Sequence, residues 1–97
     1  MYASVIEGSF KPESRDEAIA LADKLVGELS GKVEGLRGFI TIDNGDDTST
    51  SIAMYESKEA FEAAAPVAQE ILSQLGPFMT GMPKRSGREV LIAKRFE

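Results

Sequence analysis

The 97-residue sequence predicts an α+β fold with the element order β-α-β-β-α-β. Two segments carry apolar residues at the three- and four-residue spacing of an α-helix. Each is preceded and followed by a segment rich in β-branched and aromatic residues, as expected of strands. Between the two central β-rich segments, Asn44-Gly45 marks a tight hairpin, because both residues tolerate the positive φ angles of such a turn.

The first half of the chain contains a predicted strand over residues 2–9 and a helix that starts near Ser14. Ser14 and Glu17 form an S-x-x-E pattern, in which each side chain covers the free backbone N–H of the other residue. An apolar stripe follows at helical spacing, and Gly31 ends the helix. The stripe consists of Ala18, Leu21, Ala22, Leu25 and Leu29.

The second half begins with a predicted hairpin of residues 37–43 and 48–56, followed by a second helix that Ser57 is placed to cap. The apolar stripe of this helix contains Pro66. Because proline lacks an N–H and clashes with the preceding turn, we expect the helix to bend or restart there. A loop over residues 76–87 leads to a last predicted strand over residues 89–96.

This order is that of a ferredoxin-like fold, in which one four-stranded antiparallel sheet carries both helices on one face. We expect residues 1–97 to form a single domain of this kind. The bare sheet face of a monomer should be polar, but the strands are apolar on both sides, most clearly in residues 90–93 (VLIA). The pattern therefore predicts a homodimer in which the two bare faces pack together.

Composition limits the classes of function. The sequence contains no Cys, His or Trp, so thiol chemistry, catalysis by His and Ser-His-Asp triads are excluded. A net charge of −5 disfavours nucleic acid or an anionic membrane as a partner. No apolar run approaches the roughly 20 residues of a membrane span, and the first residues lack a signal-peptide pattern. We therefore expect a cytoplasmic protein.

Metal and nucleotide chemistry have little support in the sequence. Without His and Cys, the remaining ligands are carboxylates, which suit Mg²⁺ or Ca²⁺. Asp43, Asp46 and Asp47 cluster in the predicted turn, but Asp is itself a common turn residue. No Gly-rich segment matches a phosphate-binding or dinucleotide-binding pattern. The sequence thus predicts neither a metal site nor a cofactor.

Several short motifs mark the boundaries between elements. They are KP before the first helix, GLRGF at the second strand, the DNGDDT turn, and SIAMYESKEAFEA from the third strand into the second helix. With these motifs, the chain resembles the antibiotic biosynthesis monooxygenase-like proteins of the dimeric α/β-barrel superfamily. That family commonly has a strand ending in an aromatic residue, followed by Glu/Asp-Ser-x-Glu-Ala. The motifs mark the ends of helices and strands and are not catalytic signatures.

The resemblance implies a homodimer whose two sheets form a barrel, with a small apolar cavity between sheet and helices in each subunit. Some members oxidise aromatic polyketides or quinols with O₂ and without metal or flavin. Others degrade haem with a His and a Trp, which this sequence lacks. Two functions follow: a small cofactor-independent monooxygenase of an aromatic or quinol-like molecule, or a non-catalytic dimeric barrel that binds a small apolar ligand or partner.

Candidate site residues follow from what a cofactor-free oxygenase needs, which is a dry pocket and a few polar groups to steady an oxyanion. Tyr55 can donate a hydrogen bond to such an oxyanion, and Arg37 can pair with a phenolate or enolate. Phe61, Phe78 and Met82 are candidates for the substrate pocket. Each has a structural alternative: Tyr55 fills a strand–helix junction, Arg37 is a solvated cation, Phe61 is core, and the two loop residues serve dimer packing.

Overall fold

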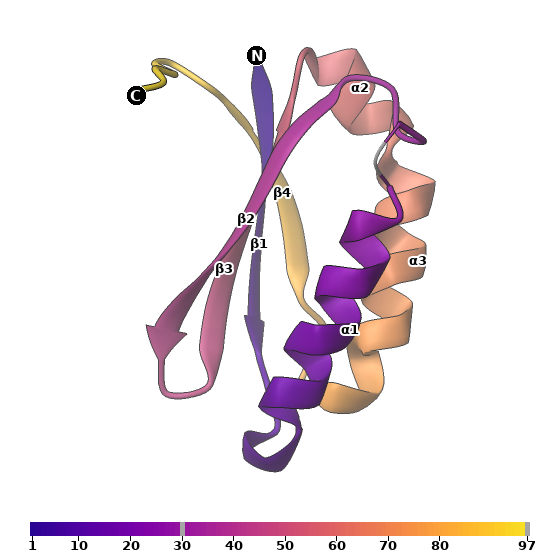
Figure 1. Cartoon of the computed structure of the whole chain (residues 1–97), viewed down its shortest axis with the longest axis vertical. Coiled ribbons are helices and arrows are strands. Elements are labelled where there is room, and N and C mark those ends of the chain that lie inside the picture. The colour runs from indigo at the N-terminus through magenta and orange to yellow at the C-terminus, as the bar shows by residue number, and fades with distance from the viewer. Residues whose placement is uncertain (30, 97) are drawn as a thin grey trace.

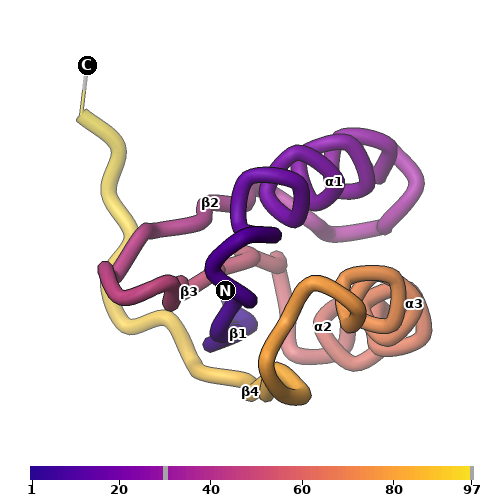
Figure 2. Tube along the Cα trace, turned by 90° about the horizontal axis from the view of Figure 1, so that it is seen from below, coloured from indigo at the N-terminus to yellow at the C-terminus, as the bar shows by residue number. Residues whose placement is uncertain are grey.

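The computed structural model, which describes residues 1–29 and 31–96, contains the predicted order of strands and helices (Figure 1). The described residues form one four-stranded antiparallel sheet in the order β2-β3-β1-β4. The helices lie together on one face of it (Figure 2), so the ferredoxin-like fold is confirmed. The elements are β1 (Tyr2–Ser9), η1 (Pro12–Ser14), α1 (Arg15–Gly27), β2 (Leu36–Gly45), β3 (Thr48–Tyr55), α2 (Lys58–Ala63), α3 (Ala65–Leu75), η2 (Gly76–Phe78) and β4 (Lys84–Glu89).

Strand β1 holds the sheet together because it pairs on both sides. Its register with β3 runs from Tyr2↔Tyr55 to Ser9↔Thr48. Its register with β4 starts at Tyr2↔Glu89 and continues to Glu7. Since side chains alternate between the faces of a strand, this register decides which residues of three strands point toward the helices.

The second helix is interrupted at Ala64, as the position of Pro66 predicts. Helix α2 ends at Ala63 and α3 begins at Ala65. The Ala64 N–H donates to the carbonyls of Ala60 and Glu62, so Glu62 keeps a partner although the helix is broken. The predicted cap is also confirmed, since the Ser57 hydroxyl oxygen accepts the Ala60 N–H at 3.1 Å.

The local predictions at Ser14 and at the hairpin turn differ from the structure. Ser14 precedes α1, but its side chain makes no capping bond, because a 3₁₀ turn over Pro12–Ser14 leads into the helix instead. The hairpin turn lies at Asp46-Asp47, whose φ angles are 53° and 58°, rather than at Asn44-Gly45. A register irregularity between Asp43 and Gly45 shifts the turn along the chain.

The predicted last strand, residues 89–96, is wrong. Strand β4 is Lys84–Glu89, although Lys, Ser and Gly are poor strand formers. Pairing to β1 decides its position, because β1 begins at Tyr2 and the Val90 N–H donates to the Met1 carbonyl. Residues 91–96 have the better strand sequence, but no strand of the described chain lies beside them.

Buried side chains form two clusters at opposite ends of the sheet. One surrounds Phe10 and Met79 beyond the end of β1, with Ala18 and Leu75 from the helices. The other surrounds Tyr55 at the end of β3, and Ala53 and Ala64 complete it. Because β1 pairs Tyr2 with Tyr55 and leads to Phe10 at its other end, the middle of the sheet lies between the two clusters.

The sheet face away from the helices is apolar, as the strand pattern predicts. Ile40 pairs with Ile52, and Ile52 pairs with Val5, so one apolar row crosses three strands. Ile40 is 56% exposed and Ile42 is 45% exposed. The homodimer remains a prediction. Among the described helices, none combines the length and the apolar character that crossing a membrane requires.

The Ser57 cap gives a test of the α2 start. We expect Ser57→Ala to lower the free energy of unfolding by about 0.5–2 kcal/mol, because the Ala60 N–H loses its acceptor. Urea denaturation followed by circular dichroism measures this change. Ser73→Ala, on an exposed position of α3, is the matched control and should change stability by less than about 0.5 kcal/mol. Equal effects of the two substitutions would contradict the capping role.

Candidate functional site

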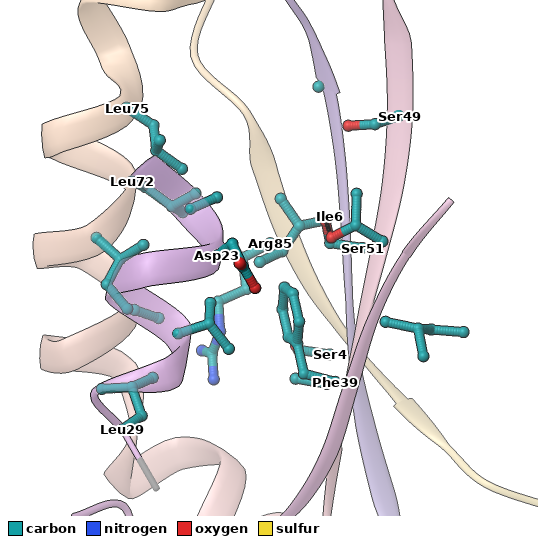
Figure 3. A pocket seen from close by; sticks show the side chains of 18 of the residues that line it. Ser4, Ile6, Asp23, Leu29, Phe39, Ser49, Ser51, Leu72, Leu75 and Arg85 are labelled. Carbon is teal, nitrogen blue, oxygen red and sulfur yellow. Dashed lines mark hydrogen bonds between the residues drawn. The ribbon is translucent and has the colours of Figure 1, made fainter. Parts of the chain in front are cut away.

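A cavity of about 610 Å³ lies between the sheet and the helices (Figure 3). This volume is in the range of small-molecule pockets, about 300–1,000 Å³. Its helix side is aliphatic, and Figure 3 shows Leu72 and Leu75 on that side. Its sheet side is made largely of small residues. The aliphatic residues on the helix side include Ile19, Val26, Leu29, Ile71, Leu72 and Leu75.

The cavity exists because small side chains occupy the middle of the sheet on the helix side. Alternation along β1 brings Ser4 and Gly8 to this face, and alternation along β3 brings Ser49, Ser51 and Ala53. The serines and Gly8 are too short to reach the helices, whereas Ala53 packs in the Tyr55 cluster. The two end clusters keep the sheet and the helices apart, so the space between the sheet and the helices stays open.

Arg85 supplies a positive charge to this cavity. In the register of β4 with β1, Arg85 lies opposite Ile6, and both side chains line the cavity (Figure 3). The guanidinium carbon lies 3.9 Å from the centroid of the Phe61 ring and 6.0 Å from that of Tyr55. One terminal nitrogen donates to the Phe61 carbonyl at 2.9 Å. Stacking and this bond hold the cation against the cavity wall.

Two polar atoms in the cavity wall lack partners among the described residues. The Nε of Arg85 is buried and makes no hydrogen bond, and the same holds for the hydroxyl of Ser4. Ser4 is only 1% exposed. Leaving a buried polar group unpaired costs about 1–3 kcal/mol.

Tyr55 lines the cavity and is 5% exposed, so the structure places this predicted residue at the site. Its ring packs edge-on against Phe61, with centroids 5.9 Å apart. Phe61 itself does not line the cavity. It lies between the rings of Tyr2 and Tyr55 and under the guanidinium of Arg85, so it supports the wall from behind.

The other predicted site residues lie elsewhere. Arg37 is exposed on β2, where it pairs with Glu56 and does not line the cavity. Phe78 packs against the Phe10 cluster. Met82 is exposed and borders a smaller polar hollow beside the hairpin. The prediction that Phe78 and Met82 belong to the substrate pocket is therefore wrong: of residues 76–82, Met79 is the one that lines the cavity.

Sequence reasoning missed Arg85 because it placed the last strand at residues 89–96 and left residue 85 in a loop. Alternation in β4 gives the correct face once the strand is moved to Lys84–Glu89. The small residues carried a signal as well. Ser4, Ile6 and Gly8 share one face of YASVIEGS, and Ser49, Ser51 and Ala53 share one face of TSTSIAMY. Most of these residues are smaller than the side chains that a filled core would need.

An ion pair joins the start of α1 to the end of β2. Arg15 lies 3.0 Å from the Asp43 carboxylate. The backbone N–H of Gly45 and the charge of Arg15 lower the pKa of Asp43 below its ordinary value. In the described part of the chain, no group of three His, Cys, Asp or Glu residues is arranged to hold a metal ion.

Comparison with known proteins gives structural relatives only. No family model matches the chain, and no curated protein matches its sequence. A protein of unknown function from Nitrosomonas europaea, NE2512, has a TM-score of 0.81 and 14% identity over 99% of this chain and 94% of that one. The ActVA-Orf6 monooxygenase of Streptomyces coelicolor, solved with nanaomycin D, has a TM-score of 0.77 and 21% identity over 99% of this chain and 92% of that one.

A third solved structure, described as an antibiotic biosynthesis monooxygenase, has a TM-score of 0.74 and 14% identity over 95% of this chain and 100% of that chain. The chain has the fold of the antibiotic biosynthesis monooxygenases. At these identities the likeness concerns the fold alone, which confirms that part of the resemblance seen in the sequence motifs.

The packing of Tyr2 and Phe61 beside Arg85 requires a glycine at position 87. A Cβ at this position would lie 2.6 Å from Cε2 of Tyr2 and 3.0 Å from Cε2 of Phe61. We expect Gly87→Ala to displace both rings and to lower the free energy of unfolding by about 1–3 kcal/mol. Thermal and urea unfolding measure this. Gly38→Ala in β2 is the control, because nothing lies within 4 Å of the added Cβ. A Gly87→Ala variant with the same free energy of unfolding as the parent chain would contradict the tight packing.

Proposed function

We propose that the protein is a small cofactor-independent monooxygenase that oxidises an aromatic or quinol-like molecule in the cavity. The observation that carries the proposal is the guanidinium of Arg85, which is stacked on Phe61 in the wall of an otherwise largely apolar space. An aromatic ring system matches the apolar walls. A phenolate or enolate oxygen on that ring system matches the cation.

The reaction needs little from the protein because the substrate is the reductant. With an anthrone, loss of a proton from the ring CH₂ forms an enolate, which transfers electrons to O₂. One oxygen atom becomes the new carbonyl, and the other leaves as water with the two methylene hydrogens. A group that binds the enolate oxygen favours the first step, because it stabilises charge that develops there.

In this proposal, the guanidinium of Arg85 attracts the developing oxyanion, and Phe61 keeps the guanidinium in place. The ring of Tyr55 forms part of the cavity wall, and its hydroxyl is a further hydrogen-bond donor. Arg37 has no part in it, because its guanidinium pairs with Glu56 on the surface.

The fold relatives support the proposal without deciding it. One of them is a monooxygenase with nanaomycin D bound, and another has no known function. The alternative is a non-catalytic barrel that binds a small apolar ligand or partner. The apolar walls favour that alternative as well, since they would hold such a ligand without any reaction.

Oxygen uptake with a panel of hydroquinones and anthrones tests the activity. We expect Arg85→Met to lower kcat/KM by roughly 100-fold or more, because the oxyanion loses its cation. Tyr55→Phe should lower turnover while leaving folding stability nearly unchanged. Arg88→Met is the matched control, since Arg88 lies exposed on the opposite face of the same strand.

The outcomes separate the two functions. Ligand binding that depends on Arg85 without oxygen uptake would support the non-catalytic barrel. Turnover that is unchanged in Arg85→Met would overturn the proposed mechanism. If Tyr55 is structural, Tyr55→Phe should change neither affinity nor rate by more than about twofold, a few tenths of a kcal/mol.

A further inference from the structure

Asp23 is a second charged residue in the cavity wall, opposite in sign to Arg85. It lies on α1, and Figure 3 shows its carboxylate pointing from that helix into the space between helix and sheet. Residues three and four apart lie on the same face of a helix. Asp23 therefore shares the cavity-lining face of α1 with Asp16, Ile19 and Ala20, and a regular helix holds its position.

The two acids on this face of α1 differ in their surroundings. Asp16 lies 3.1 Å from the guanidinium of Arg15. Among the described residues, Asp23 forms no ion pair, either with Arg85 or with any other base. The carboxylate of Asp23 and the guanidinium of Arg85 thus do not neutralise each other, and both charges remain available to a molecule in the cavity.

Asp23 also lies where the cavity meets water. Most of the exposed residues that line the cavity belong to α1 or to the edge strand β2, for example Asp23 and Thr41. The lining residues of β1 and β3, such as Ser4 and Ala53, are buried or half-buried. Figure 2 shows α1 on the β2 side of the sheet. The cavity therefore opens between α1 and β2, with Asp23 at its mouth.

We propose that Asp23 is the general base of the reaction and takes a proton from the ring CH₂ of an anthrone-like substrate. This inference rests on the proposed oxygenase function, in which that proton must leave before the enolate can react. The sequence contains no His, so a carboxylate is the proton acceptor that the cavity offers. A carboxylate base combined with a group that stabilises the oxyanion is sufficient to remove a proton beside a carbonyl. Asp23 and Arg85 supply these two parts.

The step is a proton transfer without a change of oxidation state. The C–H bond of the CH₂ group breaks, its electron pair moves toward the ring carbonyl oxygen, and the proton forms an O–H bond with Asp23. The carboxyl group then gives this proton to water at the mouth of the cavity. The oxygen atom that later leaves as water takes up protons from the solvent, so the overall reaction is unchanged.

A base at this position favours anthrones over hydroquinones as the substrate class. A phenolic O–H proton exchanges rapidly with water, whereas a C–H proton leaves slowly unless a base is placed beside it. Removing Asp23 should therefore slow the reaction of an anthrone much more than that of a hydroquinone.

Hydrogen exchange in the absence of O₂ tests Asp23 by itself. Anthrone is incubated with the protein in D₂O under nitrogen, and deuterium in its CH₂ group is measured by NMR. We expect the parent chain to accelerate this exchange above the rate in buffer. At saturating anthrone, Asp23→Asn should slow the protein-catalysed exchange by at least about 100-fold. The dissociation constant of anthrone should change by less than about threefold.

Asp16→Asn is the matched control, because Asp16 lines the same cavity from the same helix but is paired with Arg15. It should change the exchange rate by less than about twofold, a few tenths of a kcal/mol. Circular dichroism should be the same for both variants, since both side chains are exposed. An equal loss in the two variants would assign the effect to negative charge at the mouth and overturn the proposal.

Three other results would overturn the proposal. They are a parent chain that exchanges no deuterium into anthrone, an Asp23→Asn variant that exchanges as fast as the parent, and a variant that loses binding instead of rate. Oxygen uptake is measured separately. Uptake that does not depend on Asp23 would leave the oxygenase without this base, whereas exchange that depends on Asp23 without uptake would keep the base and remove the oxygenase.

Discussion

The small side chains on the helix side of the sheet are the constraint on which the remaining structure depends. Ser4, Ser49 and Ser51 are too short to meet the helices, so the core divides into two clusters at the ends of the sheet. Large residues at these positions would fill the space and merge the clusters into one core. The cavity is therefore built into the strands, and the helices only close it.

Arg85 is held in this space by an arrangement that its neighbours make possible. Gly87 lacks a side chain, which lets the rings of Tyr2 and Phe61 come close to the strand, and Phe61 then supports the guanidinium. A buried nitrogen without a partner lowers stability. Costs of this kind are found most often at functional sites.

The two faces of the sheet contribute differently to the stability of this short chain. A chain of this length buries only about 60–65% of its unfolded surface. The cavity removes contacts on one face, and the other face carries the row of Val5, Ile40 and Ile52 without a covering layer. Folding of the chain thus depends heavily on strand pairing to β1.

The sequence alone determined the element order, the break before Pro66 and the Ser57 cap, because these depend on local periodicity and on one or two backbone groups. It also indicated the apolar outer face and the approximate position of Tyr55. Tertiary pairing decided the rest. Strand β4 formed at Lys84–Glu89 because that is where β1 offers partners, although the following residues have the stronger strand preference. That displacement turned Arg85 into the cavity and left residues 90–96 outside the sheet, and no local pattern could reveal it, since register depends on contacts between distant segments.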